Sequence, residues 1–346
     1  MGEEFSWAQV ISKLLARRNL SEDEAAAAMS EIMEGAATPA QIAGFVISLR
    51  AKGESVEEVV GLVTTMRSYA QKVEVSGDVL DTCGTGGDRL GTFNVSTAAA
   101  LVCAGAGARV AKHGNRAASS RCGSADVLET LGVRIDLPPE GVSRCIAEAG
   151  IGFCFAPVFH PAMRHAASPR RELGVATIFN FLGPLTNPAG ATRQALGVSD
   201  PRMLEPMVET LGRLGSTHVI AFHGDGGIDE LATSGPSQIV ELRGAELRGT
   251  ELKKWTFDPA DVGVARASIG DIAGGSAEEN AATIRSVLAK KAGPERDIVV
   301  LNSAAGLVAG GLAADLHEGV ELAAQTIDSG RAAEALDGLV EVSNSA

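Results

Sequence analysis

Apolar side chains recur at helical spacing through the first seventy residues. Ile42, Phe45 and Leu49 form one such set, spaced three and four residues apart. Four segments also begin with a capping-box pattern, in which a Ser or Thr hydroxyl accepts from the third helical amide and a Glu or Gln reaches back. The four pairs are Ser6 with Gln9, Ser21 with Glu24, Thr38 with Gln41, and Ser55 with Glu58. The pattern predicts a small all-helical domain of four helices over residues 1–72.

From about residue 78, short apolar runs typical of strands alternate with helix-like segments. The expected strands cover residues 79–80, 109–111, 133–137, 217–222 and 298–301, and the expected helices include 95–107 and 124–131. This alternation predicts a larger α/β domain over residues 73–346, with a mostly parallel central sheet flanked by helices. Such sheets bind ligands at the carboxyl ends of their strands. We interpret the glycine- and proline-containing stretch 179–190 as a linker or hinge, and we expect a segment near 165–190 to join the helical domain.

Composition narrows the class of protein. Of the 346 residues, 45 % are apolar and 21 % are charged, which is enough for a sizeable core in one large domain or two. The formal net charge of −13 disfavours a general nucleic-acid or anionic-membrane binder. No apolar stretch is long enough for a membrane span, and the acidic N-terminus does not resemble a secretory signal. The five cysteines form no CxxC pair, which favours reduced, mostly buried thiols. We expect a soluble, cytoplasmic enzyme.

Two windows of the chain are poor in acids and rich in cations. Residues 89–125 hold no Asp or Glu, and their basic residues are Arg89, Arg109, Lys112, Arg116 and Arg121. Residues 149–199 contain four arginines, with Glu172 as the one acid. In a chain of net charge −13, such windows indicate a local site for a polyanion. Chance and helix packing are the alternative explanation.

A glycine-rich loop, Gly84-Thr85-Gly86-Gly87-Asp88, directly follows the first expected strand. Glycines let the backbone adopt positive φ and approach a ligand closely. Successive amides in such a turn, together with the positive end of the following helix, form a site for phosphate. The spacing matches neither a P-loop nor the dinucleotide-binding GxGxxG pattern. A tight structural turn is the alternative.

Two further features suggest a magnesium site. Asn94 and Ser96 begin the next expected helix, where Ser96 could ligate Mg²⁺, although either residue could simply cap the helix. Asp229 and Glu230 are adjacent carboxylates in a glycine-rich loop after the expected strand 217–222. Mg²⁺ binds through one or two carboxylates together with water and substrate phosphates. A solvated acidic turn is the alternative for this pair.

The motif Lys112-His113-Gly114-Asn115-Arg116 follows the second expected strand at the same end of the sheet. Its lysine supplies a point charge for phosphate, and its histidine and asparagine offer hydrogen bonds. Ser119, Ser120 and Ser124 add hydroxyls in a loop that could fold over a bound phosphate. The chain has no Ser-His-Asp order, no HExxH motif and no zinc-type cysteine spacing. The combination therefore points to Mg²⁺-assisted chemistry on a diphosphate, without a covalent intermediate.

Read together, these segments resemble the anthranilate phosphoribosyltransferase family over nearly the whole chain. The matching motifs, in order, are DTCGTGGD (81–88), NVSTAAA (94–100), KHGNR (112–116), SSRCGSADVLETLGV (119–133), HPAMRHA (160–166), RREL (170–173) and FNFLGPLTNP (179–188). The resemblance implies the type II nucleoside phosphorylase fold and a homodimer joined through the helical part. It also implies transfer of the phosphoribosyl group of 5-phosphoribosyl 1-diphosphate to the anthranilate amine, with release of diphosphate, in tryptophan biosynthesis.

The resemblance also assigns roles to individual positions. Lys112, Asp229 and Glu230 would be catalytic. Two Mg²⁺ ions per subunit would bind, one at Ser96 with Glu230 and one at Asp229 with Glu230. The residues that would contact phosphoribosyl diphosphate are Gly84, Gly87, Asp88, Thr92, Asn94, Val95, Ser96, Thr97, Lys112, His113, Gly114, Asn115, Arg116, Ala117, Ala118, Ser119, Ser120 and Ser124.

By the same resemblance, anthranilate would contact Gly84, Asn115 and Arg170, and His113 and His160 would line its path. Two other functions remain open. A pyrimidine nucleoside phosphorylase of the same fold would use inorganic phosphate, but the loop motifs and the acid pair argue against it. A non-catalytic paralogue that binds nucleic acid should have a basic face, which the net charge of −13 disfavours.

Overall fold

The computed structural model describes residues 5–117, 121–244 and 252–346. Four helices come first: α1 (Trp7–Leu15), α2 (Glu22–Met33), α3 (Pro39–Lys52) and α4 (Val56–Ser68). The capping boxes predicted at Ser21, Thr38 and Ser55 all form, since each hydroxyl accepts from the third helical amide and each cap amide donates to the Glu or Gln. The box predicted at Ser6 is wrong, because that side chain makes no cap hydrogen bond.

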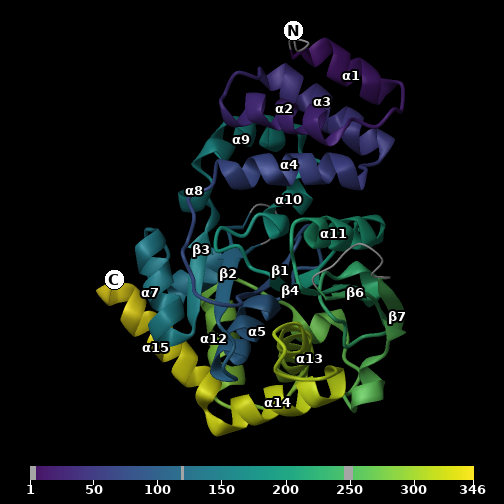
Figure 1. The fold of residues 1–346 in the computed structure, drawn as a ribbon. Coiled ribbons are helices and arrows are strands. Elements are labelled where there is room, and N and C mark those ends of the chain that lie inside the picture. Colours follow the sequence, from purple (N-terminus) through teal and green to yellow (C-terminus); the bar gives the residue numbers. More distant parts are fainter. Residues whose placement is uncertain (1–4, 118–120, 245–251) are drawn as a thin grey trace.

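A single seven-stranded sheet forms the centre of the remaining described residues (Figure 1). Its spatial order is β3-β2-β1-β4-β5-β6-β7. Neighbouring strands from β3 to β5 in this order pair in parallel. β6 pairs antiparallel with β5, and β7 pairs antiparallel with β6. The predicted mostly parallel sheet is therefore confirmed. The strands are β1 (Leu80–Gly84), β2 (Val110–Gly114), β3 (Ile151–Phe155), β4 (Arg193–Gly197), β5 (His218–His223), β6 (Ser237–Arg243) and β7 (Lys253–Phe257).

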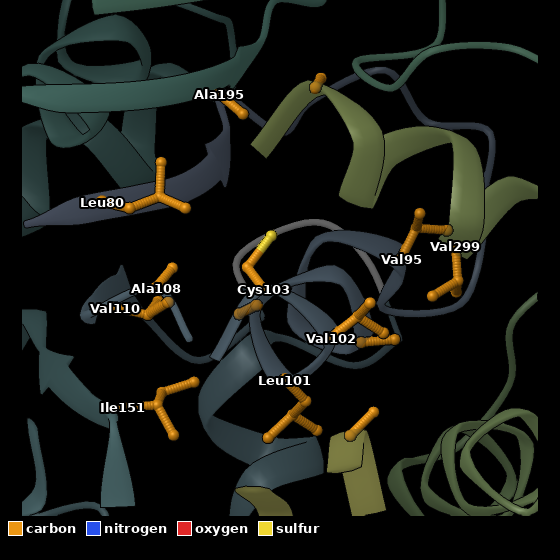
Figure 2. Close-up of a cluster of buried hydrophobic side chains, with 14 of the residues drawn as sticks. Leu80, Val95, Leu101, Val102, Cys103, Ala108, Val110, Ile151, Ala195 and Val299 are labelled. Carbon is orange, nitrogen blue, oxygen red and sulfur yellow. The ribbon is translucent and has the colours of Figure 1, made fainter. Parts of the chain in front are cut away.

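Helices cover both faces of the sheet. On one face, α5 (Val95–Gly105) and α13 (Pro294–Ala309) pack against the central strands. Figure 2 shows this core, in which Leu80 of β1 and Val110 of β2 face side chains of α5. On the other face, α10 (Phe179–Leu185) and α11 (Pro201–Arg213) lie between the sheet and the N-terminal helices (Figure 1). The sheet thus separates two apolar cores.

The remaining helices surround these layers. Among them, α9 packs against α2 and α3, and α14 packs against α13. Their bounds are α6 (Ser124–Thr130), α7 (Pro139–Ala149), α8 (Ala156–Phe159), α9 (Arg164–Leu173), α12 (Ala277–Leu288), α14 (Leu316–Ser329) and α15 (Arg331–Ser345). Within the described ranges, no helix is long and apolar enough to cross a membrane. The five cysteines are buried, as expected.

Two of the expected strands are wrong. Residues 133–137 form no strand and instead run as irregular chain between α6 and α7. Residues 298–301 belong to α13, in which every side chain from Ile298 to Ala309 is buried. A helix that is apolar on all sides shows no helical period, so its short apolar runs resemble a buried strand. The stretch 179–190, interpreted as a linker or hinge, begins with the helix α10, and its role as a hinge stays a prediction.

Candidate active site

The glycine-rich loop leaves the carboxyl end of β1 and bends against the acid pair. Gly86 and Gly87 have φ of +65° and +82°, in the left-handed region that glycine tolerates. The Gly86 amide donates a 2.7 Å hydrogen bond to Asp229 Oδ2. A Cβ on Gly84 would lie 2.3 Å from the same oxygen. A glycine is therefore required at position 84 for the Asp229 carboxylate to reach the loop.

The start of α5 joins the acid pair to Lys112. The Ser96 amide donates to Glu230 Oε1 at 3.2 Å, and Lys112 Nζ donates to Ser96 Oγ at 3.3 Å. Lys112 is only 2 % exposed, and its ammonium group also donates to Thr82 O at 2.6 Å. The buried ammonium group therefore lies between the end of β1 and the start of α5. Together these bonds place the loop, α5, Lys112 and Asp229–Glu230 in one continuous cluster, as the sequence predicts.

Asn94 occupies the N-cap position of α5, as the capping alternative expects. Its side chain makes no cap hydrogen bond. Instead Asn94 Nδ2 donates to Cys122 O at 3.2 Å, and Asn94 Oδ1 accepts from Asn280 Nδ2 at 2.9 Å. These bonds tie the start of α5 to α12 and to the segment before α6. Of the neighbouring predicted contacts, Val95 and Thr97 are buried.

Alternate residues of a strand face opposite sides of the sheet, and this separates two parts of the site. Lys112 lies on the α5 side, where Thr82 Oγ1 donates to Ser96 O at 3.2 Å. Its neighbour His113 lies on the α10 side, where its Nδ1 is 3.0 Å from Gly183 O. The ammonium group and the carboxylates therefore share the α5 side, and the imidazole lies on the other.

The carboxylates of the site are buried close to one another, with the Lys112 ammonium group nearby. Burial, and then the nearby Asp88, raise the pKa of Asp229 to about 7. Burial, and then Asp229, raise the pKa of Glu230 well above its usual value, with Lys112 opposing. Asp88 Oδ2 is buried without a hydrogen-bond partner among the described residues. A divalent cation would relieve this arrangement.

The donor set fits Mg²⁺. Two adjacent carboxylates, Asp229 and Glu230, lie next to Ser96, which are the hard oxygen ligands that this ion prefers. Across residues 5–117, 121–244 and 252–346, no three His, Cys, Asp or Glu side chains are grouped as a metal site. Mg²⁺ does not require such a cage, because it keeps several waters and binds substrate phosphates.

The motif after β2 begins the next loop and contacts α6. A Cβ on Gly114 would lie 2.1 Å from Ser124 Oγ, and that hydroxyl donates to Asn115 O at 3.3 Å. Arg116 is exposed, and it forms ion pairs with Asp126 and Glu129 rather than facing the cluster. The Ala117 amide donates to Asp126, whereas the predicted contacts Ala118, Ser119 and Ser120 lie outside the described residues.

Two buried histidines face each other on the α10 side of the sheet. The rings of His113 and His160 are 5.2 Å apart, and burial lowers their pKa values to about 3 and about 4. Neither nitrogen of His160 has a hydrogen-bond partner within the described part of the chain. Arg170 of α9 lies 5.4 Å above the Phe179 ring, and burial lowers its pKa. These are the residues predicted to line and hold the aromatic substrate.

Two supporting residues are not predicted by the sequence reasoning. Buried Asp81 accepts from the His113 amide at 3.2 Å and from Asn187 Nδ2 at 2.8 Å. Buried Asn302 of α13 binds both the amide and the carbonyl of Leu231, directly after the acid pair, at 2.8 and 3.0 Å. Most buried polar side chains are hydrogen-bonded. A lone Asn in the apolar run of α13 is therefore the signal in the sequence that could have indicated a supporting role for Asn302.

Two family models match the chain. The model described as glycosyl transferase family, a/b domain, matches residues 76–333, and the one described as glycosyl transferase family, helical bundle domain, matches residues 8–70. An anthranilate phosphoribosyltransferase of Moorella thermoacetica is 54 % identical over 332 residues, which are 95 % of this chain and 96 % of that protein. The chain belongs to the anthranilate phosphoribosyltransferase family. The resemblance read from the motifs is confirmed.

Solved members of the family have the same architecture. The crystal structure of anthranilate phosphoribosyltransferase from Thermus thermophilus has a TM-score of 0.90 at 45 % identity, covering 97 % of this chain and 99 % of that one. The enzyme from Saccharomyces cerevisiae, in complex with PRPP and Mg, has a TM-score of 0.88 at 26 % identity and covers 98 % of each chain. The predicted combination of a helical domain and an α/β domain is confirmed.

Proposed function

We propose that this protein transfers the phosphoribosyl group of 5-phosphoribosyl 1-diphosphate (PRPP) to the amine of anthranilate and releases diphosphate, as a step of tryptophan biosynthesis. The observation that carries the proposal is the continuous cluster at the carboxyl ends of β1 and β2. In it, Asp229 binds the Gly86 amide at 2.7 Å, Glu230 binds the Ser96 amide at 3.2 Å, and Ser96 binds Lys112 at 3.3 Å. The family's named activity requires such a diphosphate site.

Three groups of this chain would stabilise the diphosphate. The glycine-rich loop offers backbone amides without side-chain obstruction, with Gly87 at positive φ and in open space. The N-terminus of α5 adds the positive end of an eleven-residue helix. Lys112 adds an ammonium group in a buried position, where burial lowers its pKa and the neighbouring Asp81 raises it. Preorganised positive charge of this kind favours departure of an anionic leaving group.

We place two Mg²⁺ ions at the acid pair, one with Ser96 and Glu230 and one with Asp229 and Glu230. The raised pKa values of both carboxylates, which burial and then a neighbouring carboxylate cause, support this placement, and so does the unpaired Asp88 oxygen, because a bound cation would stabilise all three oxygen groups. When bound, Mg²⁺ neutralises the charge on the diphosphate and so promotes cleavage of the bond to ribose.

Anthranilate would be held on the other side of the sheet edge. Arg170 matches the carboxylate of anthranilate, and the guanidinium plane suits such a pair. Asn115 would donate or accept a hydrogen bond beside Gly84. Burial keeps His113 and His160 uncharged at neutral pH, because their pKa values are about 3 and about 4. Uncharged rings offer the aromatic substrate a largely apolar path.

In the proposed reaction, the amine nitrogen forms a bond with C1 of ribose as the C1–O bond to diphosphate breaks, and the amine then loses a proton. An aromatic amine is neutral at pH 7, so no strong base is needed for the attack. The protein's main contribution is to hold both substrates in contact and to stabilise the leaving group. The boundary between the helical domain and the α/β domain lies near residue 72 in this proposal, and residues 179–190 act as the hinge. Closure of the two domains about this hinge would exclude water from the activated sugar.

We further propose that the protein is a cytoplasmic homodimer joined through its helical part. Apolar residues on two N-terminal helices support this arrangement. Leu15 of α1 is 70 % exposed, and Ile47 of α3 is 39 % exposed. Exposed apolar side chains on neighbouring helices suit a subunit interface. Ile47→Glu should lower the mass measured by light scattering from that of two chains to that of one, and an unchanged dimer would contradict this interface.

Loss of anthranilate fluorescence after addition of PRPP and Mg²⁺ tests the proposed activity directly. The wild-type protein should consume anthranilate, and a chelator should stop the reaction. The double substitution of Asp229 and Glu230 by Ala should abolish turnover at any Mg²⁺ concentration. An enzyme that leaves anthranilate unchanged but cleaves thymidine with inorganic phosphate would be a nucleoside phosphorylase instead.

A further inference from the structure

The segment between β4 and α11 contacts the glycine-rich loop through Ser199. The Ser199 amide donates to Thr85 Oγ1 at 3.0 Å, and the Ser199 hydroxyl donates to Gly86 O at 2.8 Å. The hydroxyl also lies 3.0 Å from Thr85 Oγ1. The Thr85 amide in turn donates to Gly197 O at 2.9 Å. Four polar contacts therefore hold the first half of the loop against this segment.

These contacts are important because the loop has little else to fix it. A Cβ on Gly86 or on Gly87 would meet nothing within 4 Å, so the loop is open on the side where these side chains would point. Both residues have positive φ, and glycine samples that region and others almost equally. The Gly86 amide donates to Asp229, and the Gly86 carbonyl, which lies in the next peptide group, accepts from Ser199. Ser199 therefore helps to fix the Gly86 conformation that turns its amide toward Asp229.

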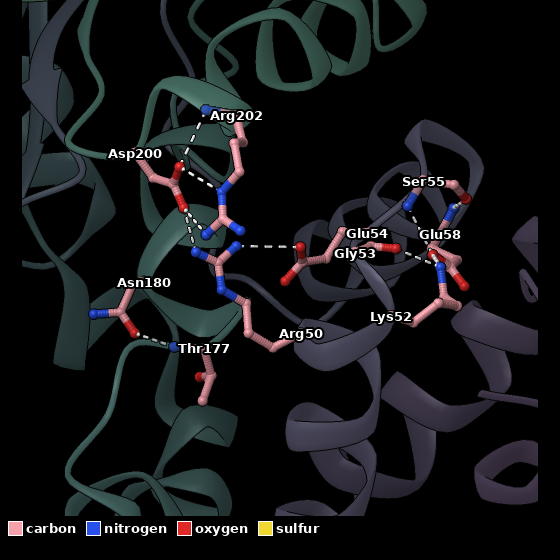
Figure 3. A network of polar contacts seen from close by, with 10 residues as sticks. All are labelled: Arg50, Lys52, Gly53, Glu54, Ser55, Glu58, Thr177, Asn180, Asp200 and Arg202. Atoms are coloured by element: carbon pink, nitrogen blue, oxygen red, sulfur yellow. Dashed lines mark hydrogen bonds and ion pairs between the residues drawn. The ribbon is translucent and has the colours of Figure 1, made fainter. Parts of the chain in front are cut away.

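The next residue, Asp200, contacts the helical domain (Figure 3). Its carboxylate forms an ion pair with Arg50 of α3, 150 positions away in the chain. Arg50 also pairs with Glu54 at 3.3 Å, and its guanidinium lies 5.2 Å from the centre of the Phe181 ring in α10. The side chains of Arg50 and Asp200 are only 20 % and 16 % exposed. A partly shielded pair such as this is less weakened by solvent than an exposed one.

Asp200 is held rigidly on its own side as well. It is the N-cap of α11, where its Oδ1 accepts from the Arg202 amide at 3.1 Å. The Arg202 side chain also pairs with Asp200, but it is 76 % exposed and belongs to the same domain. Arg202 therefore provides a control: it contacts the same carboxylate as Arg50 without crossing between the helical domain and the sheet.

We propose that Ser199 and Asp200 couple the position of the helical domain to the shape of the glycine-rich loop. Asp200 takes its position from Arg50 of α3, and the adjacent Ser199 transmits that position to Thr85 and Gly86. Ser199 and Arg50 are then positioning residues: neither touches substrate, and both act on the affinity for PRPP through the loop. The inference rests on the proposed binding of PRPP by this loop.

The test measures KM for PRPP, KM for anthranilate, kcat and melting temperature at saturating Mg²⁺. The variants are Ser199→Ala, Arg50→Gln, their double mutant, and Arg202→Gln as the control. Asp200→Asn adds a variant that keeps a good N-cap residue but removes the charge that pairs with Arg50. If Arg50→Gln fails to fold, Asp200→Asn takes its place in the cycle.

We expect Ser199→Ala, Arg50→Gln and Asp200→Asn each to raise KM for PRPP about tenfold, in line with the loss of one hydrogen bond or ion pair that orders a binding loop. If the loop binds PRPP, as proposed, KM for anthranilate should stay within about twofold of its wild-type value. Arg202→Gln should leave all kinetic constants unchanged. Because Arg50 and Ser199 act on the same loop, the double mutant should show a smaller increase than the product of the single increases.

Three results would overturn the inference: an unchanged KM for PRPP in Ser199→Ala, equal increases for Arg202→Gln and Arg50→Gln, or single effects that multiply in the double mutant. Each of these leaves the proposed function intact if Asp229→Asn still loses activity. Full activity in Asp229→Asn would instead contradict the proposed function itself. A purely structural role for Arg50 would lower the melting temperature without separating the two KM values.

Discussion

Gly84→Ala perturbs the site through one methyl group. Gly84 ends β1 without a positive φ, so an alanine backbone can adopt its conformation. The added Cβ would lie 2.3 Å from Asp229 Oδ2 and 3.0 Å from Asp229 Cγ, distances at which the carboxylate must move. When the carboxylate moves, the 2.7 Å bond from the Gly86 amide breaks and one proposed magnesium ligand is displaced.

The size of the effect follows from that hydrogen bond. A hydrogen bond to a charged group contributes about 1.5–3 kcal/mol. If it is lost from the transition state, kcat/KM for PRPP should fall about 10- to 150-fold. The assay is the initial rate of anthranilate consumption over a range of PRPP and Mg²⁺ concentrations. The Mg²⁺ concentration needed for half-maximal rate should rise as well, because Asp229 is displaced.

Gly338→Ala is the matched control, because it adds the same methyl group in the interior of α15. Its Cβ would lie 3.5 Å from Ala149 Cβ, an ordinary contact. Kinetic constants should be those of the wild type, and the protein should be stabilised by about 0.5–1 kcal/mol because Ala is the better helix former. Wild-type kcat/KM in Gly84→Ala would refute the placement of Asp229 against the loop.

Three more predictions concern other parts of the structure. Asn302→Ala leaves the buried amide and carbonyl of Leu231 without a partner, so urea unfolding should show a loss of about 1–3 kcal/mol; an unchanged midpoint would contradict the support assigned to Asn302. Burial lowers the pKa values of His113 and His160 far below the unfolded value of about 6.5. Below pH 6.5 the unfolded chain therefore binds more protons than the folded protein, so the free energy of unfolding decreases as the pH falls from about 6.5 toward 4. Urea unfolding between pH 6.5 and 5 should show a slope of up to about 1.4 kcal/mol per pH unit for each histidine, and His160→Gln should remove one share; an identical slope in the variant would contradict the buried, neutral assignment. Arg170→Met should raise KM for anthranilate at least about tenfold, as expected for loss of a charged pair, and leave KM for PRPP unchanged, whereas the reverse pattern would exclude its role at the carboxylate.

Local signals in the sequence predict local structure well here. The capping boxes at Ser21, Thr38 and Ser55 are confirmed because each depends on residues only three positions apart. The α13 segment shows the limit of this reasoning. Whether its apolar run is a strand or a helix depends on what surrounds it, and it is buried on all sides.

In the candidate site, too, the features that could be predicted are those that do not depend on contacts between distant segments of the chain. The loop, α5 and the acid pair could be predicted because strand ends of a parallel sheet meet at one edge. The burial of Lys112 could not, since it depends on which face of β2 points toward α5 and on the distant acceptor Thr82 O. Ser199 acts on a loop 113 positions earlier in the chain, a contact that only the pairing of β1 with β4 creates.

The central claim is that the glycine-rich loop, Lys112 and the acid pair act on one diphosphate. A crystal structure of the protein with PRPP and Mg²⁺ tests it most directly. We expect a diphosphate between residues 84–88 and the start of α5, close to Lys112, with Mg²⁺ held by Asp229 and Glu230. A diphosphate bound elsewhere, with Asp229 and Glu230 free of metal and substrate, would contradict the account.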